Sequence, residues 1–169
     1  EVYMFQLPIR TLDAEHSTGS SELGQLPDWN LNDLYTATDA KELIRDLNWL
    51  EKECNEFAKS YEGKLHTLSD KEMLTCIVRN EKISSISGRI ISYAGLLYYQ
   101  KTTDADRAKF LSDMQEKITV FTTKLVFFSL EINSLEDEFL DKLFTKNNQL
   151  ARYKPVFEKI RAMKPYQLN

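Results

Sequence analysis

The sequence predicts an all-α protein: a helical bundle that contains a long antiparallel helix hairpin and is preceded by an irregular N-terminal leader. Its 169 residues include only five glycines and four prolines, and so few turn-forming residues disfavour β-sandwiches and barrels. Apolar residues also recur at steps of three and four over long stretches, which is the period of an amphipathic helix. A chain of this length suffices for one domain with a continuous core.

The two ends of the chain differ in composition. Residues 1–26 lack the continuous apolar run of a signal peptide and are expected to be a flexible or loosely docked leader. A helical lobe is then expected over 27–169. Residues 1–38 contain six acids against Arg10, whereas 141–169 contain seven bases against two acids. The basic end is a candidate patch for a nucleic acid or an acidic partner, or a solvated face or docking surface for another domain.

The first helix is expected from about residue 40 to 61. Asp39 and Glu42 have the spacing of a capping box, with Asp39 as the N-cap residue. Gly63 follows, at a position where a left-handed residue commonly ends a helix. The apolar face of this helix comprises Leu43, Leu47, Leu50, Cys54, Phe57 and Tyr61.

Two longer helices are expected to form the antiparallel hairpin, over about 70–99 and 104–133. Ser69 and Glu72 provide a second capping box at the start of the first of them. The other is capped near Thr103, and its apolar stripe keeps a helical period to the end. The stripe consists of Phe110, Met114, Ile118, Phe121, Leu125, Phe128 and Ile132.

Two short helices complete the predicted bundle. One lies near 135–145 and opens at Ser134, which three acids follow at the positive end of the helix dipole. The other follows Pro155, because proline suits the first turn of a helix.

Small residues share one face of the second helix: Ser84, Gly88, Ser92 and Gly95. Glycine inside a helix costs roughly 1 kcal/mol relative to alanine. This face is therefore expected to pack closely against another helix, or against a bound peptide backbone.

No catalytic or metal-binding residue is assigned in this chain. Neither His16 nor His66 belongs to an H-E-x-x-H segment, and no nucleophile elbow, P-loop or dinucleotide fingerprint occurs. Cys54 and Cys76 are expected at similar heights on two antiparallel helices. They are interpreted as buried, inert thiols, with a redox pair as the alternative.

Glu131 and a group of aromatic residues are the remaining candidates. Glu131 is flanked by apolar neighbours, so it either projects from the polar face of its helix or is buried with a partner. The aromatic residues are expected to belong to the core, or to bind peptide side chains. They are Tyr93, Tyr98, Tyr99, Phe127 and Phe128.

Five ordered segments carry a family resemblance. Leu26–Tyr35 contains W-x-L-x-D-L-Y, Tyr61–Leu65 reads Y-x-G-K-L, and Arg89–Leu97 contains S-Y-A-x-L. Leu125–Ile132 contains F-F-x-L-E, and Lys164–Leu168 closes the series. Together they resemble the N-terminal lobe of oligoendopeptidase F, a bacterial member of the thimet-oligopeptidase-like zinc metallopeptidases.

The resemblance implies one lobe of a two-lobed, cytoplasmic zinc metalloendopeptidase. Such a lobe helps to wall a deep channel that restricts substrates to short peptides. The zinc would be held by H-E-x-x-H and a further glutamate in a C-terminal catalytic domain, and no position here matches that motif. The expected partners are therefore that domain and short peptides, with no nucleic acid and no membrane, and the fragment alone is expected to be inactive.

A free-standing helical adaptor is the alternative function. It would bind a protein partner through the basic end of the chain and the small-residue face of the second helix.

Overall fold

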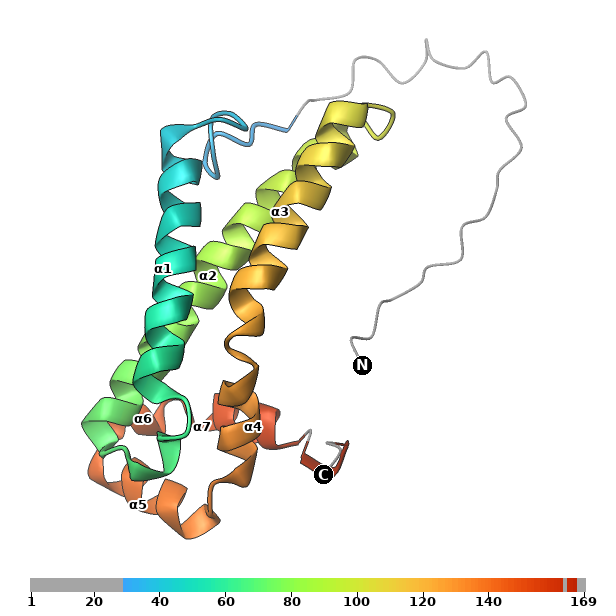
Figure 1. Ribbon diagram of the computed structural model, residues 1–169. Coiled ribbons are helices and arrows are strands. Elements are labelled where there is room, and N and C mark those ends of the chain that lie inside the picture. Colours follow the sequence, from blue (N-terminus) through green and yellow to red (C-terminus); the bar gives the residue numbers. More distant parts are fainter. Residues whose placement is uncertain (1–28, 163, 167–169) are drawn as a thin grey trace.

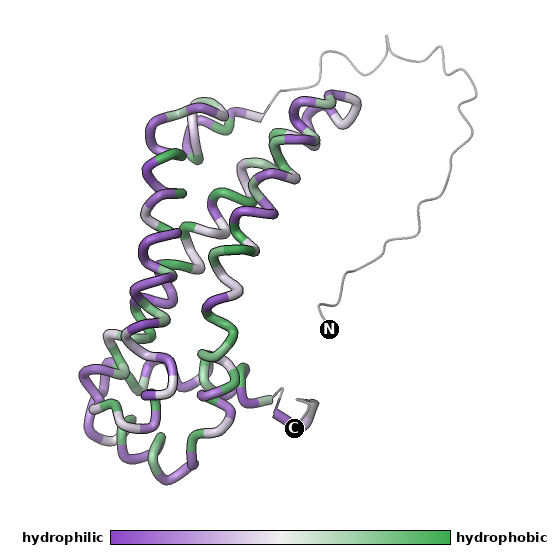
Figure 2. The backbone as a smooth tube through the Cα atoms, in the orientation of Figure 1, coloured by the Kyte–Doolittle hydropathy of each residue, from purple (hydrophilic) through white to green (hydrophobic). Residues whose placement is uncertain are grey.

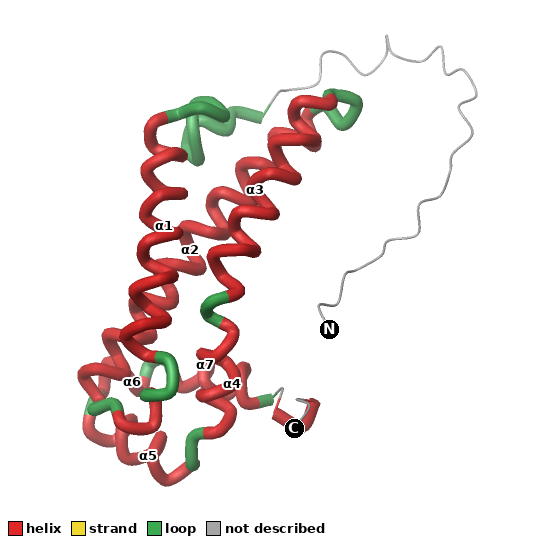
Figure 3. Tube along the Cα trace, viewed as in Figure 1, coloured by secondary structure: helices red, strands yellow, loops and turns green. Residues whose placement is uncertain are grey.

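The computed structural model describes residues 29–162 and 164–166, and it confirms the all-α fold (Figures 1 and 3). No strand occurs in these two ranges. The predicted leader, 1–26, lies outside them. The helices are α1 (Lys41–Tyr61), α2 (Asp70–Gln100), α3 (Ala105–Thr123), α4 (Val126–Ser134), α5 (Asp137–Lys146), α6 (Asn148–Ala151) and α7 (Lys154–Arg161), with short 3₁₀ helices η1 (Leu65–Thr67) and η2 (Lys164–Tyr166).

Three long helices form the body of the molecule. Helices α2 and α3 make the predicted antiparallel hairpin, and α1 packs along both of them (Figure 1). The shorter helices α4–α7 gather around the end of the bundle at which α2 begins. Apolar and polar residues alternate along each helix (Figure 2), as expected for amphipathic helices that share one core.

The second capping box forms as predicted, and the first does not. Ser69 Oγ accepts the Glu72 N–H at 3.3 Å, and Glu72 Oε2 accepts the Ser69 N–H at 2.8 Å. Helix α1, in contrast, begins at Lys41, and its N-cap residue is Ala40, which has no side-chain acceptor. Asp39 therefore lies one position too early to cap the helix.

The predicted third helix is interrupted, which shortens the hairpin arm. Helix α3 ends at Thr123 and α4 begins at Val126. Thr119, Thr122 and Thr123 each donate a hydroxyl hydrogen bond to the carbonyl four residues earlier, at 2.7–2.8 Å. Such bonds compete with the backbone and bend helices, and β-branched residues also have low helix propensity. The apolar stripe is continuous across this break, and the helix is not.

The last helices differ from prediction in their boundaries. Ser134 donates its hydroxyl to the Glu131 carbonyl and ends α4, so it does not open α5. Helix α6 was not predicted. It starts at Asn147, whose Oδ1 accepts the N–H groups of Gln149 and Leu150. Pro155 lies in the first turn of α7, as predicted.

The small-residue face of α2 does not pack against another helix. Ser84, Gly88 and Ser92 are exposed, and a Cβ atom placed on Gly88 would have no neighbour within 4 Å. The prediction of a closely packed face is therefore wrong. Helices α1 and α3 instead cover the face of α2 that carries Ile83, Ile90 and Ala94.

None of the helices in the described part of the chain has the length and apolarity of a membrane span.

Candidate functional site

The residues considered for metal and redox chemistry form no metal site in the described part of the chain, where no three His, Cys, Asp or Glu side chains are grouped so that they could hold an ion. His66 is exposed in η1, and His16 lies outside the described residues. Cys54 and Cys76 are free thiols with no exposed surface. Burial raises the pKa of Cys54 to about 11 and that of Cys76 to about 12, so both stay protonated at neutral pH.

Glu131 is the candidate acid that has a partner. Its carboxylate accepts the N–H of Gly63 at 2.5 Å and the N–H of Leu65 at 3.2 Å. Gly63 has φ of 74°, so it adopts the left-handed conformation predicted after α1. Glu131 thus joins α4 to the turn between α1 and α2, and its role in this chain is structural.

Three of the five aromatic candidates belong to the core or pack against it. The Tyr93 ring packs edge-on against Tyr35, with 5.4 Å between ring centroids. Phe127 and Phe128 both pack against Phe57, at 6.1 Å and 5.7 Å between centroids. Tyr98 and Tyr99 are the exceptions: Tyr98 is half-buried, and its ring centroid lies 5.5 Å from that of Tyr99, which is exposed.

The segments that resemble oligoendopeptidase F contact one another in the fold. Tyr35 donates its hydroxyl to Asp46, a buried carboxylate, at 2.9 Å. Burial and then this hydrogen bond raise the pKa of Tyr35. Arg89 lies over the Tyr35 ring at 4.4 Å and donates to the Leu34 carbonyl at 2.6 Å. The first and third segments therefore meet at Arg89, and the second and fourth meet at Glu131.

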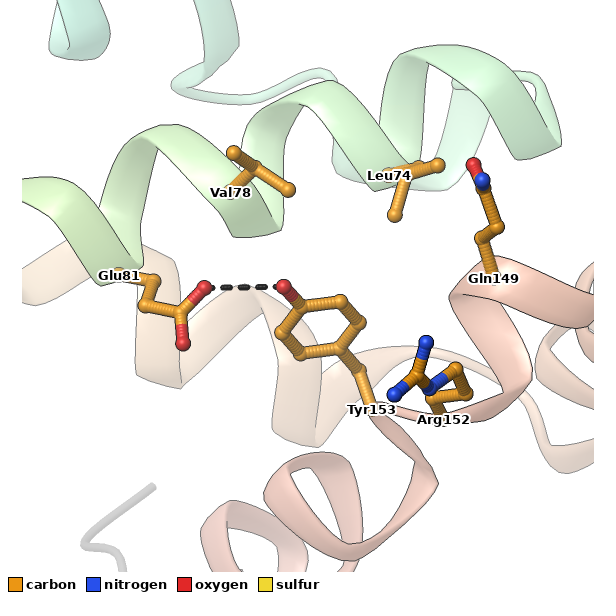
Figure 4. A pocket seen from close by; sticks show the side chains of 6 residues that line it. All are labelled: Leu74, Val78, Glu81, Gln149, Arg152 and Tyr153. Atoms are coloured by element: carbon orange, nitrogen blue, oxygen red, sulfur yellow. Dashed lines mark hydrogen bonds between the residues drawn. The ribbon is translucent and has the colours of Figure 1, made fainter.

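A groove between α2 and the α6–α7 segment is a candidate binding site (Figure 4). Its volume is about 500 Å³, within the usual range of ligand sites. Helix α2 contributes Leu74, Val78 and Glu81, and the opposite wall consists of Gln149, Arg152 and Tyr153. Figure 4 shows both walls projecting side chains toward the space between them.

Two hydrogen bonds hold the walls of this groove together. At one end Asn147 donates its side-chain N–H to Asp70 at 3.2 Å. At the other end the Tyr153 hydroxyl donates to Glu81 at 2.9 Å. This bond is the main cause of the raised pKa of Tyr153. Hydrogen bonds therefore join the two walls at both ends of the groove, and the groove is open between them.

Sequence reasoning missed this groove. A signal was present on α2, where Asp70, Leu74, Val78 and Glu81 follow one another at helical spacing and so share a face. The opposite wall lies more than 70 residues away in sequence, and no local pattern shows that α6 and α7 fold back onto α2.

Comparison with known protein families finds a match at the C-terminal part of the sequence. Residues 131–169 match the family model Peptidase_M3_N, described as Oligopeptidase F. This stretch is therefore similar to the N-terminal region of oligopeptidase F. Searches of curated proteins and of solved structures found no match. The matched stretch begins at Glu131, the residue that binds the turn after α1, and it includes one whole wall of the groove.

Proposed function

We propose that this chain is the N-terminal substrate-channel lobe of a cytoplasmic zinc metalloendopeptidase that hydrolyses short peptides. The lobe comprises residues 27–169, residues 1–26 are a leader, and the chemistry belongs to a C-terminal catalytic domain of the same protein. The observation that supports this proposal most is the match of residues 131–169 to the oligopeptidase F family.

Contacts within the lobe extend this argument to the long helices. Glu131, at the start of the matched region, binds Gly63 and Leu65. Helix α6 packs on α2, which lies upstream of that region. The matched residues and the long helices therefore share one folded body, and we infer that they form one lobe of the parent peptidase together.

No step of zinc chemistry is assigned to this chain. A catalytic zinc site has three protein ligands and an open position for water, and the described side chains do not form such a group. The contribution of the lobe is steric: it forms one wall of the channel and limits the length of peptide that reaches the catalytic domain.

Cleavage of a quenched fluorescent peptide tests this function. We expect no turnover by the chain with zinc, and turnover when a separately prepared catalytic domain of an oligoendopeptidase F is added and the two pieces associate. The catalytic domain alone is the control for turnover that does not need the lobe. Chelator-sensitive turnover by the chain alone, with contaminating proteases excluded, would contradict the proposal. An adaptor protein would neither bind the catalytic domain nor change its turnover.

A further inference from the structure

The groove between α2 and the α6–α7 segment has the dimensions of a short peptide. Its α2 wall runs from Leu74 to Glu81, which is about 10 Å at the helical rise per residue. An extended peptide advances about 3.3 Å per residue, so about three residues span this length. The hydrogen bonds at the two ends fix the separation of the walls, and a ligand therefore enters a site that is already formed.

The middle of the α2 wall is apolar and open. Leu74 is half-buried, and Val78 retains 45% of its surface exposed. Both side chains face the opposite wall in Figure 4. An apolar ligand side chain that packs on these two residues would bury their remaining surface, and its removal from water favours binding.

The opposite wall supplies hydrogen-bond donors. The side chains of Arg152 and Gln149 make no hydrogen bond or ion pair to another described residue (residues 29–162 and 164–166), and both are exposed beside the apolar face. A guanidinium group presents five N–H donors in a planar fork that matches a carboxylate. The amide of Gln149 adds two further N–H donors.

The two charged side chains of the groove, Glu81 and Arg152, favour one orientation of a bound peptide. Glu81 and Arg152 lie on opposite sides of the Tyr153 ring (Figure 4). Glu81 Oε2 accepts the Tyr153 hydroxyl, and the negative charge of Glu81 repels a carboxylate from that end. Arg152 attracts the carboxylate to its own end, and the Glu81 carboxylate has further lone pairs that can accept hydrogen bonds from peptide N–H groups.

We propose that this groove binds the C-terminal end of a short peptide whose last residue is apolar. The terminal carboxylate binds Arg152 and Gln149, the apolar side chain packs on Leu74 and Val78, and the preceding backbone runs toward Glu81. This inference rests on the contacts of the groove alone, and it stands whether or not the lobe belongs to a peptidase.

Backbone-amide NMR of the full chain tests the proposal with N-acetyl-Ala-Ala-Leu as the probe. We expect saturable shifts around residues 74–81 and 149–153 at millimolar peptide. The same peptide with a C-terminal amide in place of the carboxylate should bind about tenfold more weakly, because it loses a charge-assisted hydrogen bond. N-acetyl-Ala-Ala-Gly should also bind more weakly, because it lacks the apolar side chain.

A matched pair of variants separates direct contact from general charge. Arg152→Gln should weaken binding of the carboxylate peptide about tenfold and leave binding of the amide unchanged. Lys154→Gln removes the same charge two residues away, outside the groove, and should bind as the unmodified chain does. Both positions are exposed, so the variants should keep the melting temperature of the unmodified chain.

Three results would overturn the proposal. They are the absence of a saturable shift with the carboxylate peptide, equal binding of its amide, and equal loss of binding in the Arg152 and Lys154 variants. Each can be obtained without any measurement of peptide hydrolysis, so the outcome is distinguishable from that of the proposed function.

Discussion

Gly63 and Gly88 differ in backbone conformation. Gly63 has φ of 74°, whereas Gly88 lies inside α2 with open space around it. We expect Gly63→Ala to lower the free energy of unfolding by about 1 kcal/mol, because a Cβ atom strains a left-handed residue. Gly88→Ala should raise it by up to about 1 kcal/mol, because alanine stiffens the unfolded chain and favours the helix.

Urea denaturation of the two glycine variants measures both effects with the same probe. The midpoints should move in opposite directions from that of the unmodified chain. A loss of stability in Gly88→Ala would show that the small-residue face of α2 is packed after all.

The two buried cysteines should resist alkylation in the folded state. Burial raises their pKa from the usual 9.0 of a cysteine thiol to about 11 for Cys54 and about 12 for Cys76, so little thiolate is present below pH 9. In the unfolded chain both thiols regain the usual pKa, so they release their protons at lower pH than the folded chain does. The contribution of the two cysteines to stability should therefore be constant below about pH 8 and fall as the pH rises from 9 toward 11.

Mass spectrometry after iodoacetamide treatment checks the cysteine prediction. The folded chain should be alkylated slowly at pH 8, and the urea-unfolded chain quickly. Fast alkylation of either cysteine without urea would indicate an accessible, reactive thiol.

At the scale of elements, the Glu131 carboxylate joins α4 to the turn after α1. Glu131→Gln should lower the free energy of unfolding by about 1–2 kcal/mol, because one of its two N–H partners loses its acceptor and the other keeps only an uncharged one. Glu116→Gln is the matched control. Glu116 is exposed on α3, and its side chain makes no hydrogen bond to another described residue. Equal midpoints for the two variants in urea would contradict this role.

Sequence patterns predicted helices better than they predicted helix ends. The Ser69 capping box and the period of the apolar residues on α1 are local features, and the structure confirms both. The break at Thr123 was not predicted, because the apolar stripe continues through it. Three threonine hydroxyls bond back to the helix in the turns before that break and favour it, and a count of apolar spacing does not include them.

At the scale of the whole molecule, the backbone amides of the α2–α3 hairpin should be protected from hydrogen exchange to different degrees along its length. Between Ala94 and Met114 every side chain is exposed or only partly buried, whereas α2 carries buried residues from Met73 to Ala94. We expect amides of residues 96–110 to exchange with solvent faster than those of residues 73–94, because local opening near the tip exposes little apolar surface. Hydrogen exchange followed by mass spectrometry measures the difference, and uniform protection along α2 and α3 would contradict it.

The bundle was predictable from sequence, and the groove was not. Amphipathic faces and scarce glycine and proline determine that long helices pack together. The groove depends on where α6 and α7 fold back, and that position is fixed by Asn147 on Asp70 and Tyr153 on Glu81. Pairings between residues so distant in the chain have no local signature.

The two hydrogen bonds at the ends of the groove have a consequence for which fragments of this chain can fold. A fragment cut at residue 131 keeps every residue of the oligopeptidase F match, but it loses the helix on which Leu150 and its neighbours pack. Chains of about 40 residues rarely bury enough surface to fold alone. We expect that fragment to have a random-coil circular dichroism spectrum, so the boundary of the family match is not a boundary of independent folding.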